Sequence, residues 1–391
     1  MKILLLNLSD QKIPPPTSVI RADLYISIPL ATELTKRGHQ VDFLCPKESN
    51  LALPMITSDV PAFGEIIPLE TFMQITDMQK RTNLLNAFYV DIFLKLLEIA
   101  KNNAYDIIHI HTNDPLFELA FTKKISTNCV FTLHSVGSLP EIEKVVLPYF
   151  NTKKNNYFVS ISNFQRKTFP AINFTKTVYN GINTDEFKFN ELGGENLIFA
   201  GRLRQSKGVK EAILISKKLK RKIIITGAPS STDVDYFNEE IKPIITDNPL
   251  VNYITHTERA FISSFYKFGK VTVFPIQWDE PFGLVMIESM ACGSPVVAFA
   301  RGSVPEVIQD GVTGFIVNPS DDDIRGDWII KKTGLEGICE AIERIYSLSD
   351  EEYRKMRVNC NTHVEKNFSM KKMVDEYEAL YKEILTSSVK L

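Results

Sequence analysis

The sequence predicts an α/β protein with two doubly wound domains, each built on a parallel β-sheet, and three observations lead to this prediction. The chain has 391 residues, which is too long for one ordinary hydrophobic core and suits two domains of roughly 150–200 residues. Short, continuous apolar runs alternate with amphipathic segments, which is typical of strands buried on both faces and joined by crossover helices. The same pattern starts again near residue 195, after a turn-rich segment at 180–194.

Five strands are predicted in the first half, with helices between them. They are expected at residues 2–6, 40–44, 107–111, 130–133 and 157–160. Residues 26–37 have helical periodicity, and the following Gly38 suits the left-handed position that ends a helix. Residues 83–100 are apolar on more than one face and contain Lys95 as their single cation. A core helix is therefore favoured there over a basic helix on a membrane surface.

The second half repeats this organisation. Its strands are expected at residues 196–200, 222–226, 252–254, 271–274 and 295–299. A strongly periodic helix at about 370–385 follows a break near 367–369. We therefore expect a first domain at 1–185, a second domain at 186–367 and a C-terminal helical segment at 368–391.

Composition argues against several classes of protein. The formal net charge is -2, from 45 basic and 47 acidic residues, whereas nucleic-acid binders carry a basic face. The five cysteines are odd in number and widely spaced, which favours a reducing, cytoplasmic location over a disulfide framework or a zinc site. The N-terminal apolar run ends at Asn7, too early for a signal peptide, and no apolar stretch is long enough to span a membrane. Peripheral association with the inner face of a membrane stays open.

The strongest chemical signal is the segment EPFGLVMIE at 280–288, which follows a predicted strand. A helix is predicted to begin near Phe282, because Pro281 suits a helix start and Gly283 lets a ligand approach the backbone. The first free N–H groups of that helix, at about Gly283, Leu284 and Val285, would form an anion site.

Two carboxylates flank this predicted anion site. Glu288 lies about six residues along the helix, or ~9 Å from its start, and Glu280 precedes the helix. A bound diphosphate would then have Glu280 available to the hydroxyls of a hexose and Glu288 available to a ribose. The alternative for an isolated pair is that Glu280 is a first-turn charge favoured by the helix dipole and Glu288 a solvated residue.

A second signal, GRLRQSKG at 201–208, follows another predicted strand. Arg202 offers a bidentate fork and Lys207 a point charge to phosphate oxygens. Together they could neutralise a pyrophosphate leaving group that otherwise needs a divalent metal. A solvated basic turn is the alternative.

In this order the motifs resemble those of the family 4 retaining glycosyltransferases of the GT-B architecture. The matching stretches are residues 180–183, 201–208, 280–297 and 302–314, with weaker matches at 37–39, 106–111 and 132–134. The resemblance implies two Rossmann-like domains facing across a cleft and a C-terminal helix that returns to the first domain. It also implies retaining, metal-independent transfer of a hexose-type sugar from a UDP- or GDP-sugar, as in polysaccharide biosynthesis. The acceptor would be a hydroxyl of a glycan, a lipid-linked sugar or a small molecule.

The resemblance also implies roles for individual residues. It places Arg202 and Lys207 on the donor diphosphate, Glu288 on the nucleotide ribose, and His134 beside the sugar near the reacting carbon. Glu280 and the backbone from Phe282 to Leu284 would hold the transferred sugar. The expected catalytic residues are His134, Arg202, Lys207 and Glu280, and the expected donor-binding residues are Phe282, Gly283, Leu284, Val285 and Glu288. We expect no cofactor and no metal ligand.

Some features depart from this interpretation or leave alternatives open. The loop at 14–20 contains no glycine, whereas the family usually has a Gly-Gly loop there, so its contact with the donor stays open. Asp233 and Asp235 form a DxD sequence but precede a helical pattern, and are interpreted as N-terminal caps. His109 and His111 share one strand face, but no third zinc ligand is evident. A sugar-nucleotide epimerase and a non-catalytic nucleotide-sugar-binding subunit are the competing functions.

Overall fold

The computed structural model describes residues 1–9, 11–15, 21–68, 71–72, 74–102, 104–137, 139–230, 232–246, 248–255 and 259–388. Residues 16–20, which form most of the glycine-free loop, lie outside this part of the chain. The chain folds into two compact units, Met1–Tyr179 with Met373–Leu391, and Asn180–Lys372. Each unit is described separately.

The first unit is built on a seven-stranded, all-parallel sheet in the order β3-β2-β1-β4-β5-β6-β7. The strands are β1 (Lys2–Asn7), β2 (Gln40–Lys47), β3 (Met55–Pro61), β4 (Ile107–Thr112), β5 (Asn128–Leu133), β6 (Asn156–Ser160) and β7 (Phe174–Thr177). The order proceeds outward from β1 and then restarts on its other side with β4. This reversal is the topological switch point of a doubly wound sheet.

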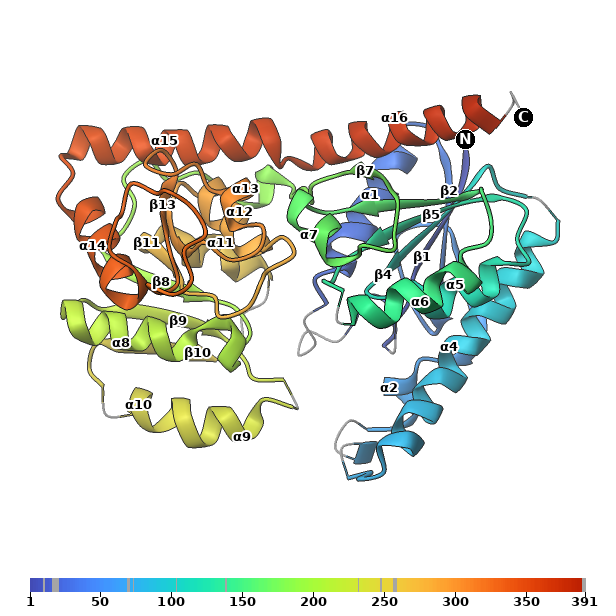
Figure 1. The fold of residues 1–391 in the computed structure, drawn as a ribbon, viewed down its shortest axis with the longest axis horizontal. Helices are drawn as coiled ribbons and strands as arrows, with labels where there is room; N and C mark the ends of the chain where they lie inside the picture. Colours follow the sequence, from blue (N-terminus) through green and yellow to red (C-terminus); the bar gives the residue numbers. More distant parts are fainter. Residues whose placement is uncertain are drawn as a thin grey trace. The chain divides into compact units, whose positions relative to one another are not determined.

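Helices cover both faces of the first sheet (Figure 1). They are α1 (Leu24–Lys36), α2 (Phe63–Ile66), α4 (Met78–Ala100), α5 (Leu116–Thr122), α6 (Pro140–Phe150), α7 (Asn163–Thr168) and α16 (Met370–Ser388). Apolar side chains of α4, α5 and α6 share one core with alternate residues of β1, β4 and β5. The opposite face of β4 and β5 contacts α16, through residues described below.

The second unit has a six-stranded parallel sheet in the order β10-β9-β8-β11-β12-β13. The strands are β8 (Asn196–Ala200), β9 (Ile223–Gly227), β10 (Val251–Thr255), β11 (Gly269–Phe274), β12 (Val296–Phe299) and β13 (Gly314–Val317). This order reverses between β8 and β11, so the loops that follow these two strands lie at the switch point of the second sheet. Ligands of doubly wound proteins bind at this position.

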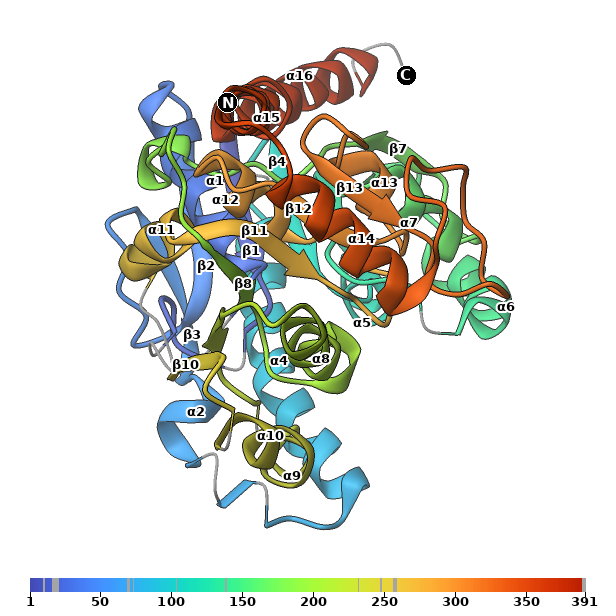
Figure 2. The same ribbon diagram turned by 90° about the vertical axis from the view of Figure 1, so that its left-hand side faces the viewer.

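The helices of the second unit also lie on both faces of its sheet. They are α8 (Val209–Leu219), α9 (Val234–Tyr236), α10 (Lys242–Thr246), α11 (Arg259–Lys267), α12 (Leu284–Ala291), α13 (Val304–Val307), α14 (Gly334–Tyr346) and α15 (Asp350–Asn367). Figure 2 shows α11 and α12 on one side of β11 and β12 and α14 on the other. A π-helical turn, Phe237–Ile241, joins α9 to α10, within the helical pattern that follows the DxD sequence.

The predicted fold class is confirmed, and all ten predicted strands are present. Three further strands, β3, β7 and β13, lie at sheet edges and were not predicted. The sequence of β3, MITSDVP, is mixed rather than continuously apolar, and its residues range from buried to exposed. An edge strand has neighbours on one side only, so its sequence carries a weaker signal of burial.

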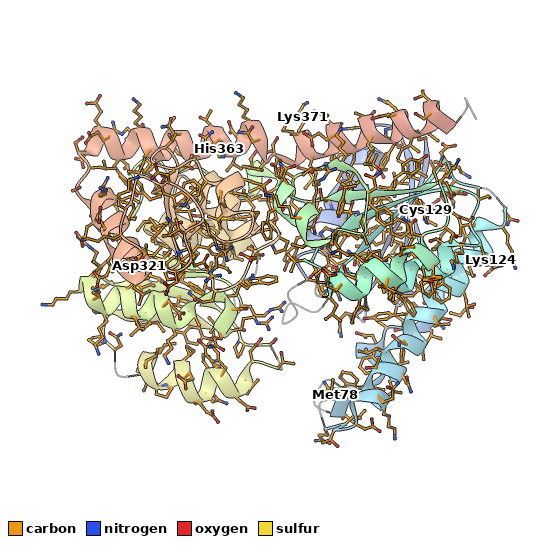
Figure 3. The ribbon with its side chains drawn as sticks, viewed as in Figure 1. Met78, Lys124, Cys129, Asp321, His363 and Lys371 are labelled. Atoms are coloured by element: carbon orange, nitrogen blue, oxygen red, sulfur yellow. The ribbon has the colours of Figure 1, made fainter. Side chains whose placement is uncertain are left out.

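All five cysteines are buried and unpaired. Cys129, labelled in Figure 3, lies on β5 inside the first unit. No disulfide therefore joins any of these five residues.

Candidate active site

Arg202 and Lys207 lie in the loop that follows β8, and this loop is packed against the end of β11. It ends at Gly208, which has a left-handed backbone with φ of 77° and directly precedes α8. A Cβ atom at Gly208 would lie 2.0 Å from the carbonyl oxygen of Pro275. Glycine is thus required by both the conformation and the close approach. Lys207, which directly precedes Gly208, is therefore held beside the segment that follows β11.

The helix of the EPFGLVMIE segment begins later than expected. It starts at Leu284, with the left-handed Gly283 (φ 83°) preceding it, and not near Phe282. Phe282 instead anchors the loop: its side chain is buried and its ring contacts that of Phe368 edge to face at 5.8 Å. Its carbonyl oxygen also accepts a hydrogen bond from Ser303 Oγ at 2.9 Å. Phe282 can therefore offer a ligand its backbone but not its ring.

Because α12 begins at Leu284, the free amide groups of the predicted anion site are not those expected for a helix that begins near Phe282. Gly283, Leu284 and Val285 are all partly exposed, whereas the rest of the helix is buried. The first amide groups of a helix have no carbonyl partner within that helix, and here they belong to Leu284 and Val285. Helix-start N–H groups and the positive end of the helix dipole favour an anion.

Two side chains of α15 hold the other end of α12. The guanidinium of Arg357 donates from Nη2 to the carbonyl of Cys292 at 3.1 Å, and Asn361 Nδ2 donates to the carbonyl of Ala291 at 2.9 Å. A cation near the carboxyl end complements the helix dipole. Hydrogen bonds from α15 therefore hold the carboxyl end of α12 in place.

Glu280 and Lys207 form a direct ion pair. Glu280 is 7% exposed, and its Oε2 atom lies 2.5 Å from Lys207 Nζ. The indole Nε1 of Trp278 donates to the same oxygen at 3.0 Å, and Lys207 Nζ lies 5.0 Å from the centroid of the Trp278 ring. The resemblance placed Lys207 on the donor phosphates and Glu280 on the sugar, but the ion pair between them was not predicted. Trp278 was not identified as a residue of the site. Trp278 could have been recognised from the sequence, because it lies only two residues before Glu280 in the same loop.

Glu288 is also buried, with 6% exposure, and is not a solvated residue. It lies four residues beyond the first residue of α12, or about 6 Å along the axis. Tyr266 of α11 donates a hydrogen bond from its hydroxyl to Glu288 Oε2 at 3.3 Å. Sequence reasoning missed Tyr266, because no local spacing connects it to Glu288.

The DxD sequence makes contacts with neighbouring side chains. Asp233 immediately precedes α9, as expected of a cap, but its carboxylate accepts a hydrogen bond from Ser230 Oγ and lies 3.5 Å from Arg204 Nε. Within the described part of the chain, no three His, Cys, Asp or Glu residues gather in a way that would hold a metal ion.

His134, the predicted catalytic residue of the first unit, belongs to a row of three histidines. His134 follows β5, and its Nε2 lies 2.9 Å from Nδ1 of His111. His109, two residues before His111 on β4, contacts Thr132 Oγ1 through Nε2 at 2.8 Å. Its Nδ1 contacts the hydroxyl of Tyr381 at 2.6 Å. His134 is therefore hydrogen-bonded to His111, whereas His109 lies near His111 with ring centroids 4.2 Å apart and is hydrogen-bonded to α16.

Burial keeps these imidazoles neutral. It lowers the pKa of His109 to about 3 and holds the pKa of His111 well below its ordinary value. It also lowers the pKa of His134 to about 4, although the Asp23 carboxylate acts in the opposite direction. At neutral pH His134 is thus a neutral hydrogen-bonding group.

Two family models match successive parts of the chain. The model described as "Glycosyltransferase Family 4" matches residues 29–186, and that described as "Glycosyl transferases group 1" matches residues 182–332. The chain belongs to the family 4, group 1 glycosyltransferases. The resemblance seen in the motifs is confirmed, and the protein is a transferase.

Relatives of this glycosyltransferase match over nearly the whole chain. An uncharacterised glycosyltransferase of Methanocaldococcus jannaschii is 25% identical over 387 residues, covering 90% of this chain and 92% of the relative. The N-acetyl-alpha-D-glucosaminyl L-malate synthase of Bacillus anthracis is 25% identical over 392 residues, covering 91% and 92%.

Solved structures share the fold. Sucrose-phosphate synthase of Thermosynechococcus elongatus superposes with a TM-score of 0.73 at 17% identity, covering 99% of this chain and 100% of that one. Anabaena HepE, solved in complex with UDP and glucose, superposes with a TM-score of 0.70 at 16% identity, covering 98% and 99%. Among the residues that our structure describes, no helix of this glycosyltransferase is long and apolar enough to cross a membrane.

Proposed function

We propose that this glycosyltransferase moves a hexose-type sugar from a UDP- or GDP-sugar to an acceptor hydroxyl, with retention of the anomeric configuration and without a metal ion. The observation that carries the proposal is the joint placement of Lys207, Glu280 and the start of α12 at the switch point of one sheet. The complex of Anabaena HepE with UDP and glucose supports a nucleotide-sugar donor. The acceptor is a glycan, a lipid-linked sugar or a small molecule, and a lipid-linked acceptor would bring the enzyme to a membrane surface.

The leaving diphosphate is the group whose charge grows during transfer. We assign its stabilisation to Arg202, to Lys207 and to the amide groups of Leu284 and Val285, because fixed donors aimed at developing charge lower the barrier most. The Lys207 ammonium has three N–H donors. It can therefore keep one on Glu280 and offer the others to phosphate oxygens.

The two buried carboxylates have separate roles in this proposal. Glu280 accepts hydrogen bonds from hydroxyls of the transferred sugar, and Glu288 accepts them from the ribose. His134 is proposed to contact the transferred sugar as a neutral group. No side chain is assigned as a nucleophile, since the leaving phosphate oxygen takes up the acceptor proton on the face where the new bond forms.

Substitution of the two carboxylates tests this division. We expect Glu288→Ala to weaken UDP or GDP binding about tenfold or more, since hydrogen bonds to charged groups contribute roughly 1.5–3 kcal/mol. Glu280→Gln should mainly lower kcat. Calorimetric titration and initial rates of the purified chain measure the two effects. Glu336→Gln, at an exposed surface pair with Lys218, is the matched control.

The carboxylate experiment also separates the competing functions. Unchanged binding and turnover in both variants would show that the site is misplaced. Isomerised nucleotide sugar in the absence of acceptor would support an epimerase, and nucleotide-sugar binding without turnover would support a non-catalytic subunit.

A chelator tests the proposed absence of a metal. With Arg202 and Lys207 supplying the positive charge, EDTA should leave the initial rate of transfer unchanged. A complete loss of activity that manganese restores would overturn the metal-independent mechanism.

A further inference from the structure

Trp278 makes a contact that the proposed reaction leaves unused. It is partly exposed and lies in the loop between β11 and Glu280. The neighbouring Gln277 fixes this loop twice: its amide donates to the carbonyl of Ser206 at 2.9 Å, and its side chain donates to the carbonyl of Pro275 at 2.7 Å. The indole of Trp278 is therefore attached to a restrained backbone.

Both donors to the Glu280 carboxylate converge on one of its two oxygens. Within the described part of the chain, Lys207 Nζ at 2.5 Å and Trp278 Nε1 at 3.0 Å both bind Oε2. A carboxylate has about four acceptor positions on its two oxygens, so Oε1 keeps its capacity to accept hydrogen bonds from a ligand.

The two donors differ in how well they fix the plane of the carboxylate. Rotation about the terminal bond of glutamate is broad, and lysine is a mobile point charge on a flexible stem. The indole is rigid and donates along one direction. Its ring also faces the ammonium of Lys207, 5.0 Å from the centroid, a distance at which a cation is attracted to an aromatic face.

We propose that Trp278 is a positioning residue: its indole N–H holds Glu280 Oε2 so that Oε1 faces a hydroxyl of the transferred sugar. This inference rests on the proposed role of Glu280 toward that sugar. Trp278 acts through Glu280 and does not itself touch the reacting atoms. It makes the enzyme selective for donors that carry the hydroxyl, since an acceptor atom fixed in place discriminates against an analogue that lacks its partner.

A double-mutant cycle tests the proposal. Trp278→Phe removes the N–H but keeps an aromatic face beside Lys207. Trp328→Phe, at the other tryptophan of the chain, is the matched control, because the described residues offer its buried Nε1 no hydrogen-bond partner. Rates are measured with UDP-glucose, or with whichever nucleotide sugar the chain turns over fastest, together with the monodeoxy analogues of that donor.

We expect Trp278→Phe to lower kcat about tenfold while changing UDP affinity much less. It should have no further effect in a Glu280→Gln background, because residues that act through one contact are not additive. The rate ratio between the donor and the deoxy analogue that lacks the contacted hydroxyl should also fall toward one. This ratio is independent of the fraction of protein that is folded, so it decides the question even if the variant is less stable.

Failure of this inference is distinguishable from failure of the proposed function. If Glu280→Gln lowers kcat but Trp278→Phe behaves like Trp328→Phe in rate and ratio, Trp278 has no positioning role. A fully additive cycle would also overturn the inference. If Glu280→Gln leaves transfer unchanged, the proposed role of Glu280 fails, and the role of Trp278 fails with it.

Discussion

At the scale of single residues, the first unit contains titratable groups in their uncharged forms. The three histidines described above have lowered pKa values because of burial. Glu118 of α5 is their counterpart: it is 1% exposed, and burial raises its pKa to about 7. Thr112 donates a hydrogen bond to its Oε1. Folding therefore disfavours protonation of the histidines and favours protonation of this carboxyl.

These shifts predict a specific dependence of stability on pH. Below about pH 6.5, the unfolded chain binds protons at His109, His111 and His134 that the folded chain does not, so stability falls as pH falls, by about 1.4 kcal/mol per pH unit for each histidine at full slope. For His134 this contribution extends down to its folded-state pKa of about 4. Glu118 has the opposite sign, since its neutral form is favoured in the folded chain between about pH 7 and 4.5. It should offset about one histidine.

Removal of Glu118 should therefore make the acid sensitivity steeper. We expect the Glu118→Gln variant to lose more stability than the wild type between pH 7 and pH 5, because the opposing contribution is gone. Urea denaturation at pH 7, 6 and 5 measures this difference, and Glu336→Gln again serves as the control. Parallel curves for wild type and Glu118→Gln would contradict the assigned protonation state of Glu118.

At the scale of elements, α16 contacts the first sheet through buried polar groups as well as through apolar packing. Tyr377 and Tyr381 are fully buried. Their hydroxyls contact Thr132 Oγ1 at 2.8 Å and His109 Nδ1 at 2.6 Å. At the surface, Arg37 of the first unit pairs with Asp375 at 2.7 Å and Glu378 at 3.1 Å. The register of α16 on the sheet is thus specified by hydrogen bonds as well as by packing.

Loss of one hydroxyl should loosen this element selectively. Tyr381→Phe leaves Nδ1 of His109 buried without its partner, at a cost of about 1–3 kcal/mol. Hydrogen exchange followed by peptide mass spectrometry should show faster exchange in β4 and α16 and unchanged exchange in β12. Tyr149→Phe, at a residue that is 72% exposed, should change neither. Equal acceleration throughout the chain would contradict a local role for the contact.

The sequence predicts the interiors of these elements better than their ends. Continuous apolar runs located the central strands, and the edge strand β10 was also predicted, whereas the edge strand β7, which has a neighbour on one side only, was missed. The start of α12 was placed too early because Pro281 suits a first helical position, but the core contact of Phe282 and the left-handed Gly283 delay the helix. Tertiary contacts of this kind leave no local periodicity to detect.

At the scale of the whole molecule, the chain comprises two doubly wound units, and this could be predicted because the βαβ pattern occurs twice. The resemblance implied that Lys207 and Glu280 contact the same donor. In the structure the two residues follow β8 and β11, which are neighbouring parallel strands whose carboxyl ends lie at one edge of the sheet. Which atoms meet could not be predicted. The Lys207–Glu280 pair spans 73 positions and the Tyr266–Glu288 contact spans 22, distances over which sequence spacing carries no geometric information.

The buried state of the five thiols makes this chain well suited to site-directed labelling. Burial raises the pKa of each of them, so the reactive thiolate is scarce as well as inaccessible. Cysteines introduced at Glu141 in the first unit and Lys331 in the second, whose side chains are 82% and 71% exposed, would react with maleimide dyes ahead of the native ones. Energy transfer between two such fluorophores would follow the separation of the units in solution while donor and acceptor substrates are added, without first replacing any native cysteine.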